Sequence, residues 1–453
     1  MFLGTAALFA LALGLGGLGP HAPLFNGLIE AAAFSLLVAV AIFGRTEWPT
    51  RADHLGPVLF LVLMLAIGLA QLIPLPQATW ATLPGREVPA LVAETLGWTD
   101  RSRPLSLAPE DTRLVIQSWL PPIAIFFATA AATHEERRLL ARLVVAAAAL
   151  SSVVGLLQLS FGDGTFFLDP GGIAGRYPGL FANYNHQAVF LAAAVALLPA
   201  AWNGTGKRGS LWPWWPAAFW ALASVGTLIT SSRAGLTLFA LASLVTAARM
   251  VGSRSAGRGS GRRRRALLVI GVAIAAIGFL WLIAPSSYRA ELIGSRFGAV
   301  GDDARYEFWA TTVEAIRTTF PYGAGFGTFE PVYQLVEPLE HVREIVVNHA
   351  HNDYLEFVLE AGAAGILLLL LFVIWFGERV IAIARRGKRD DPLAWSGVTI
   401  VLLVMLHSLV DYPLRTEAIG CTFAFACALL LAPLGDRSSR ARVRAPLATR
   451  ALA

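Results

Sequence analysis

The sequence has little charge and almost no cysteine. Charged residues make up 15% of its 453 residues, well below the roughly 25% that is typical of soluble domains. Hydrophobic residues make up 56%, and the mean hydropathy is +0.61, so an ordinary soluble protein is excluded. The two cysteines, Cys421 and Cys427, lie in one apolar run. We expect them to be small buried side chains and not part of a disulfide or a metal site.

Long apolar runs recur along the whole chain. About a dozen of them hold roughly 17 to 23 residues, enough for a helix to cross a hydrocarbon core about 30 Å thick. We therefore predict an all-α polytopic membrane protein with about 12 transmembrane helices. The first run lacks a basic region and a small-residue cleavage site, so we expect a retained helix and not a signal peptide. The predicted helices cover residues 2–18, 23–43, 57–76, 113–133, 143–160, 183–202, 214–231, 234–250, 266–284, 356–378, 393–412 and 416–434.

The basic residues predict how the chain crosses the membrane. If the N-terminus is cytoplasmic, the loops and the tail on that side carry 24 of the 36 lysines and arginines. Because basic residues concentrate on the cytoplasmic side of membrane proteins, we expect both termini there. The net charge of +6 then reflects topology, and we expect membrane lipids and no nucleic acid as partners of the basic segments. The cytoplasmic segments are 44–56, 134–142, 203–213, 249–265, 379–392 and 435–453.

The longest loops lie on the opposite, periplasmic side. Long ordered loops in a compact bundle usually bind or catalyse, so we expect function on this face. The largest loop is expected to contain short amphipathic helices, one of which Asp302 and Asp303 would cap and which would end near Thr319. The resulting division of the chain is 1–284 (helices one to nine, with periplasmic loops 77–112 and 161–182), 285–355 (the large periplasmic loop), 356–434 (helices ten to twelve) and 435–453 (a basic tail).

A polar cluster lies where the large loop meets the tenth predicted helix. It contains His349, His351, Asn352 and Asp353, and such groups at a membrane boundary cost free energy unless they are wet, paired or used. Alternating histidines followed by an aspartate are compatible with a metal site. A single histidine as general base is a second interpretation, because its ordinary pKa near 6.5 suits proton removal at neutral pH. Capping of the following helix is a third.

Other charged residues are expected at the periplasmic ends of the helices. Arg176, Arg233 and Arg305 lie on the side that is poor in basic residues. Their planar, bidentate side chains suit a phosphate or diphosphate, although each could also extend to the membrane interface. His407 and Asp411 are four residues apart and share a helix face, which fits either a buried hydrogen bond or a proton relay.

Four short patches resemble the O-antigen ligase family. The family signature of His, Asn, nine residues, Gly, two residues and Gly is similar to His351, Asn352, Gly362 and Gly365. The sequence departs from the ligases at Thr237, where they commonly have leucine. The other patches that look like those of the superfamily are Ser232–Gly235, Arg305 with Trp309, and Arg176 with Gly179 and Asn185.

The resemblance implies a GT-C-like glycosyltransferase of the bacterial inner membrane that needs neither metal nor cofactor and acts on the periplasmic face. Its donor would be a glycan on undecaprenyl diphosphate, and its acceptor a sugar hydroxyl of the lipid A-core. His351 would be the base of an inverting transfer, and Arg233 and Arg305, with Arg176, would bind the diphosphate. The supporting residues would be His349, Asn352, Asp353, Asn185, Trp309, His407 and Asp411.

Two alternatives are compatible with the sequence. The first is a polymerase of the same superfamily, which would join undecaprenyl-linked repeat units by the same chemistry. The second is a secondary transporter whose arginines bind an anionic substrate. Transporters of that kind usually have broken helices at matching positions in two halves, whereas Pro121 and Pro122 have no counterpart in this chain.

Overall fold

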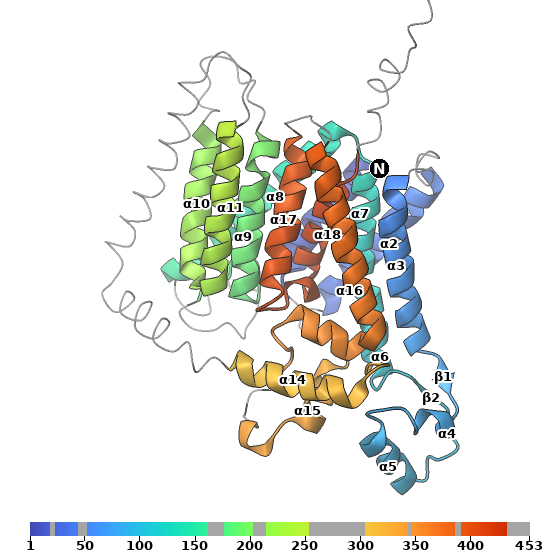
Figure 1. Ribbon diagram of the computed structural model, residues 1–453. Coiled ribbons are helices and arrows are strands. Elements are labelled where there is room, and N and C mark those ends of the chain that lie inside the picture. The colour runs from blue at the N-terminus through green and yellow to red at the C-terminus, as the bar shows by residue number, and fades with distance from the viewer. Residues whose placement is uncertain are drawn as a thin grey trace, which may run out of the picture.

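The computed structural model describes residues 1–18, 23–43, 52–161, 176–202, 214–252, 304–342, 344, 346–385 and 391–432. Helices dominate these residues (Figure 1). A single two-stranded antiparallel sheet occurs in the described chain, formed by β1 (Pro74–Leu75) and β2 (Arg103–Pro104). The prediction of an all-α protein is therefore confirmed.

Most helices run side by side in one bundle (Figure 1). Six helical stretches of the described chain are long and apolar enough to cross a membrane, and four shorter helices are also apolar. This confirms the polytopic membrane class, while the number of twelve spans stays a prediction because 266–284 lies outside the described residues. The bundle helices are α1 (Phe2–Leu15), α2 (Pro23–Phe43), α3 (Ala52–Gln71), α6 (Pro109–Ser118), α7 (Leu120–Ala130), α8 (His134–Phe161), α9 (Tyr184–Ala201), α10 (Trp215–Thr230), α11 (Arg233–Gly252), α16 (Asp353–Arg385), α17 (Pro392–His407) and α18 (Glu417–Leu429).

Two predicted boundaries were wrong for identifiable reasons. The predicted helix 113–133 is two helices, α6 and α7, separated at Trp119 with prolines in the first turn of α7. The predicted loop 134–142 is the beginning of α8, because Glu136 accepts a hydrogen bond from the Thr133 backbone N–H at 2.7 Å and caps the helix. The buried Arg137 donates to the carbonyl oxygens of Thr129 and Leu431 at 3.0 and 2.7 Å. Its charge is therefore used in packing and does not mark a loop.

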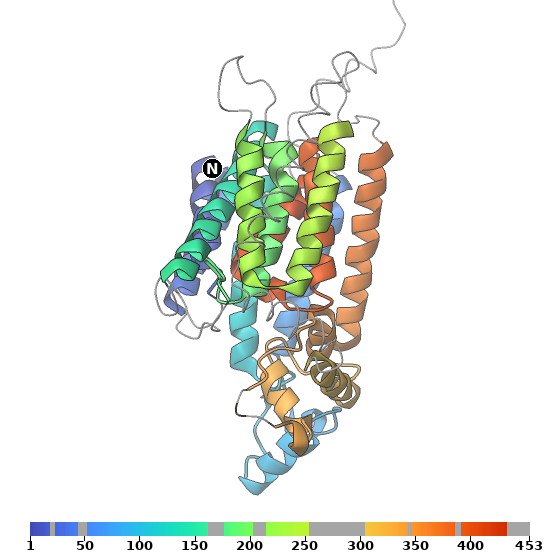
Figure 2. The same ribbon diagram turned by 90° about the vertical axis from the view of Figure 1, so that its left-hand side faces the viewer.

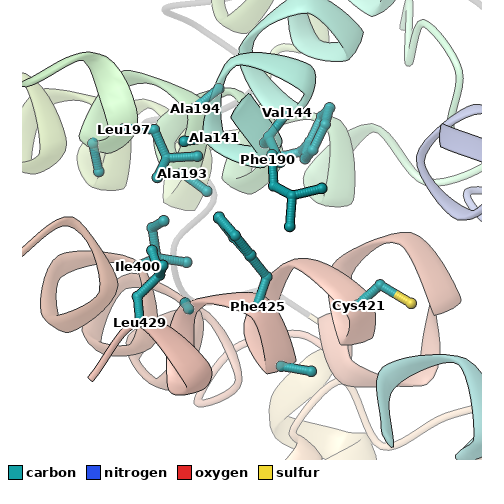
Figure 3. Close-up of a cluster of buried hydrophobic side chains, with 14 of the residues drawn as sticks. Ala141, Val144, Phe190, Ala193, Ala194, Leu197, Ile400, Cys421, Phe425 and Leu429 are labelled. Atoms are coloured by element: carbon teal, nitrogen blue, oxygen red, sulfur yellow. The ribbon is translucent and has the colours of Figure 1, made fainter. Parts of the chain in front are cut away.

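The centre of the bundle is α9, which is buried on nearly all sides. Its small side chains face α8, while α17 and α18 contribute larger ones such as Ile400 and Phe425 (Figure 3). Where helices pack in lipid, small residues allow the close approach that gives dispersion contacts. The same argument explains Gly235 at the start of α11, because a Cβ there would lie 2.2 Å from the Cβ of Ala188. Cys421 and Cys427 are unpaired and buried, as predicted.

A second layer covers one end of the bundle (Figures 1 and 2). It begins after α3 with the small sheet, α4 (Gln77–Trp80) and α5 (Glu87–Thr95), and continues with α14 (Arg305–Thr319), α15 (Phe329–Val336) and a short 3-10 helix, η6 (Leu339–His341). The predicted helix ending near Thr319 is confirmed as α14, whereas its predicted caps Asp302 and Asp303 lie outside the described residues. Helix α14 packs against α16, so the layer rests on the beginning of that helix.

A kink at Gly362 joins this layer to the bundle. Gly362 has φ 58° and ψ −139° within α16, a conformation that favours glycine. The kink leaves backbone groups of α16 without partners in the helix, and the segment between α14 and α15 forms hydrogen bonds with them. Ala363 donates to the Pro321 carbonyl at 2.9 Å, and Gly325 donates to the Glu360 carbonyl at 3.0 Å. The glycine-rich stretch that begins at Gly323 therefore forms a backbone joint to α16.

Replacement of Gly362 by alanine tests the kink. The new Cβ would lie 2.1 Å from the Pro321 carbonyl oxygen, and the positive φ adds strain, so we expect destabilisation by about 1–3 kcal/mol or more. Gly377→Ala in the same helix is the matched control, because a Cβ there meets nothing within 4 Å. Thermal unfolding of the purified proteins in detergent measures both. Equal unfolding midpoints for the two variants would contradict this account of the kink.

Candidate active site

His351 lies in the short turn that leads into α16. Its φ is 50°, an uncommon conformation that the neighbouring residues hold in place. The Asn352 side chain accepts hydrogen bonds from the Tyr354 and Leu355 backbone N–H groups at 3.0 and 3.1 Å, and donates to the Leu409 carbonyl at 3.0 Å. Asn352 is thus the cap of α16, and the turn is fixed to the segment that follows α17.

Asp411 is the charged centre beside His351. Its Oδ1 lies 3.2 Å from His351 Nδ1 and accepts a hydrogen bond from the Tyr412 backbone N–H at 2.9 Å. Its Oδ2 lies 3.9 Å from His407 Nε2 and 4.0 Å from an Arg305 nitrogen. The structure therefore brings Arg305 of α14 and His351 to the predicted pair of His407 and Asp411. The prediction that this pair shares one helix was wrong, because α17 ends at His407 and Asp411 lies in the segment that follows it.

The environment of Asp411 keeps its carboxylate ionised. Burial by itself would raise the pKa of Asp411, whose side chain has no exposed surface. The hydrogen bond from His351 and the nearby imidazoles of His186 and His407 outweigh burial and lower the pKa well below its ordinary value. An ionised Asp411 can accept a hydrogen bond from His351 Nδ1–H, and in that tautomer the lone pair of the imidazole lies on Nε2.

His349 contacts a different carboxylate. Its Nδ1 lies 2.8 Å from an oxygen of Glu356, and the other oxygen of Glu356 accepts the Ala350 backbone N–H at 2.9 Å. The ring of Tyr412 contacts both histidines, with its centroid 4.1 Å from that of His349 and 4.9 Å from that of His351. The two imidazoles thus face different carboxylates, and within the described residues no group of three or more His, Cys, Asp or Glu is arranged to hold a metal ion.

Arg415 joins α16 to the segment after α17. It lies in a short 3-10 helix, η7 (Pro413–Arg415), and makes a bidentate pair with Glu360 at 3.0 and 2.8 Å. It also lies 3.6 Å from Glu356 and 3.7 Å from Asp353. Burial would lower the pKa of Arg415, but the three carboxylates more than reverse this and raise it. Asp353 further accepts the Ser408 hydroxyl at 2.7 Å, so it is a structural anchor.

Several residues of this site were not predicted from the sequence. Glu356 and Glu360 follow Asp353 at helical spacing, and three acids on one face of an otherwise apolar helix were a visible signal for a buried cation. Their partner Arg415 and the aromatic Tyr412 follow Asp411 within a few positions. Nothing in the sequence alone indicated that this short segment lies against the beginning of α16.

The remaining predicted residues lie around the beginnings of α9, α11 and α14. The Arg176 guanidinium stacks on the Tyr184 ring, 4.1 Å from its centroid. Asn185 is buried in the first turn of α9, which Asn183 caps. Arg233 is the first residue of α11 and is exposed, at the bundle end that carries the extramembrane layer (Figure 1). Trp309 packs edge-on against Tyr306 at 5.6 Å. Joint binding of one ligand by the three arginines stays a prediction.

Part of the chain matches a known protein family. Residues 217–370 match the family described as O-Antigen ligase. This segment belongs to the O-antigen ligase family. The O-antigen ligase segment contains His351, Arg233 and Arg305, whereas Asp411 and Arg415 lie beyond its end. The curated proteins contain no match to the chain. This match supports an O-antigen ligase-like or polymerase-like function at the level of the family, whose members are glycosyltransferase-like enzymes.

Replacement of Arg415 tests whether its pairing with Glu360, Glu356 and Asp353 stabilises the protein. We expect Arg415→Met to lower the free energy of unfolding by about 3–5 kcal/mol, because three buried carboxylates lose their partner. Arg317→Met is the matched control, since Arg317 pairs with Glu314 on the surface with its side chain 73% exposed, and we expect a change below about 0.5 kcal/mol. Denaturation in detergent compares the two. A similar small loss for both would show that the buried cluster contributes nothing to stability.

Proposed function

We propose that the chain transfers a glycan from a lipid diphosphate to a hydroxyl group, with His351 as the general base. The observation that carries this proposal is the contact of His351 Nδ1 with the buried Asp411 carboxylate at 3.2 Å. It orients the ring and leaves Nε2 to accept a proton, as in other enzymes where a carboxylate holds a catalytic imidazole. Arg305, 4.0 Å from the same carboxylate, places a permanent cation beside the base.

The transfer is a single displacement. The acceptor oxygen forms a bond to the anomeric carbon while its proton passes to His351 Nε2, and the bond from that carbon to the diphosphate oxygen breaks. The diphosphate leaves with the electron pair, and Arg305 and Arg233, assisted by Arg176, stabilise its negative charge. Attack opposite to the leaving group inverts the configuration of the sugar. Asp411 stays ionised throughout and stabilises the imidazolium that forms.

The proposal places this reaction on the periplasmic face of the bacterial inner membrane, with both termini in the cytoplasm. The donor is a glycan on undecaprenyl diphosphate. The first candidate is a ligase, whose acceptor is a sugar hydroxyl of the lipid A-core. The second candidate is a polymerase, whose acceptor is a second undecaprenyl-linked glycan. The family match favours the two equally.

Three substitutions test the catalytic roles. We expect His351→Ala to lower the rate of glycan transfer by about 10²–10⁴-fold, and Asp411→Asn by a similar factor, because the amide no longer fixes the tautomer of the imidazole. Arg305→Ala should lower it by about 10²–10³-fold. Arg317→Ala, an exposed arginine of the same helix as Arg305, should retain the wild-type rate. The assay follows a labelled lipid-linked glycan with purified protein in detergent or nanodiscs.

Wild-type transfer by both His351→Ala and Arg305→Ala would refute the enzymatic assignment of these residues and favour the transporter. A uniform loss in all variants, the control included, would trace the effect to unfolding, which the denaturation measurement above detects separately.

The acceptor is decided by supplying the labelled donor with and without lipid A-core. For a ligase we expect label on the core only when the core is present. For a polymerase we expect lengthened lipid-linked chains without any core. Detection uses gel electrophoresis and mass spectrometry of the extracted lipids. No product under either condition would contradict the proposed reaction itself.

A further inference from the structure

A long cavity with a volume of about 1250 Å³ lies between α2, α3, α7, α16 and α18. Along α16 its lining extends from Asp353 to Glu378, roughly 38 Å at 1.5 Å per residue. Leu59, Val373 and Ile374 line it and are also at least half exposed on the outside of the bundle. The cavity is therefore a groove that opens on the apolar surface of the bundle, and we refer to it as the α3–α16 groove.

The groove has an apolar length and a polar end. Side chains such as Phe60, Phe372 and Ala424 line the apolar length, whereas His349 and Arg415 lie at the polar end. A groove of this kind suits an amphiphile with a long hydrocarbon chain. The chemistry of the polar end decides which class of head group it accepts.

The polar end is unsuited to a diphosphate. Arg415 is the one lysine or arginine among the described residues that line the groove, and Glu360, Glu356 and Asp353 already surround it. Glu30 and Glu417 also line the groove, and both carboxylate oxygens of Glu417 are buried without a hydrogen-bond partner among the described residues. Such oxygens suit hydroxyl donors, whereas a diphosphate would meet carboxylates of like charge.

The polar end is also next to the proposed base. His349 lines the groove, and His351, which contacts the same Tyr412 ring, lies beside Asp411 and near Arg305. A transferase with two lipid substrates needs two approaches to one reaction centre. The arginines serve the diphosphate on the His351 side, which leaves the groove for the second substrate.

We infer that the α3–α16 groove binds the acceptor, a glycolipid whose hydrocarbon chain lies between α3 and α16 and whose sugar hydroxyls meet the carboxylates at the polar end. This inference rests on the proposed transferase function. The hydrocarbon chain is acyl, as in the lipid A-core, because an isoprenyl-linked repeat unit would bring its own diphosphate to these carboxylates. Such an acceptor joins long apolar chains to a hydroxyl-rich head.

Filling the groove tests the inference kinetically. Ala424→Trp places an indole in the apolar length, and we expect it to raise the KM for the acceptor by roughly tenfold or more while the KM for the donor stays unchanged. Ala240→Trp on the exposed side of α11 is the matched control, and we expect wild-type values for both substrates. A selective increase in the donor KM, or equal behaviour of the two variants, would overturn the inference.

Photolabelling of the wild-type protein provides a second readout that needs no turnover. The probes are a lipid A-core with a diazirine in an acyl chain and an undecaprenyl-linked glycan with a diazirine near the chain end. We expect the lipid A-core probe to label peptides of α3, α16 and α18, with unlabelled lipid A-core competing and unlabelled undecaprenyl diphosphate not competing. Labelling of the same peptides by the undecaprenyl-linked probe would overturn the acyl assignment.

Labelling confined to α9–α11, or competition by undecaprenyl diphosphate in the groove, would overturn the acceptor assignment. Failure of the proposed transfer reaction is distinguishable, because labelling and competition are scored without product formation.

Discussion

The bidentate pair between Arg415 and Glu360 is the interaction on which the candidate site depends. It is buried at the end of the bundle, where a carboxylate without a partner would cost several kcal/mol. Because Arg415 closes the short segment that begins at Asp411, the pair fixes that segment against the beginning of α16. The position of the Asp411 carboxylate beside His351 follows from this constraint.

Tyr412 contacts both histidines of the polar cluster, which face different carboxylates. Asp411 gathers His351, His407 and Arg305, whereas Glu356 holds His349 beside the groove. Two histidines that are separated by one residue in the sequence thus have chemically different neighbours. The Arg305 guanidinium lies 4.0 Å from Asp411, whereas Glu356 and Glu360 line the groove.

The extramembrane layer is attached to the same place through backbone contacts. Arg86, which is buried, donates to the carbonyl oxygens of Leu105 and Gly323 at 2.5 and 3.1 Å. Burial lowers the pKa of Arg86 to about 10, and the carbonyl oxygens compensate for the lost hydration of its guanidinium. The loop between α3 and α6 is thereby tied to the Gly323 segment, which in turn is joined to the kink of α16. The extramembrane layer, the kink of α16 and the candidate site are thus connected by hydrogen bonds.

The sequence by itself determined the membrane class, most of the helices and the position of the polar cluster at the start of α16, because apolar run length and helix-breaking residues are local properties. It also indicated His351 and Arg305 as separate candidates and His407 and Asp411 as a pair. The meeting of these residues around one carboxylate, and the pairing of Arg415 with Glu360, were decided only by the tertiary structure. The contacts of Asp411 with Arg305 and His351, and that of Arg415 with Glu360, join residues 55 to 106 positions apart, and no local pattern specifies which distant polar groups will share a buried environment.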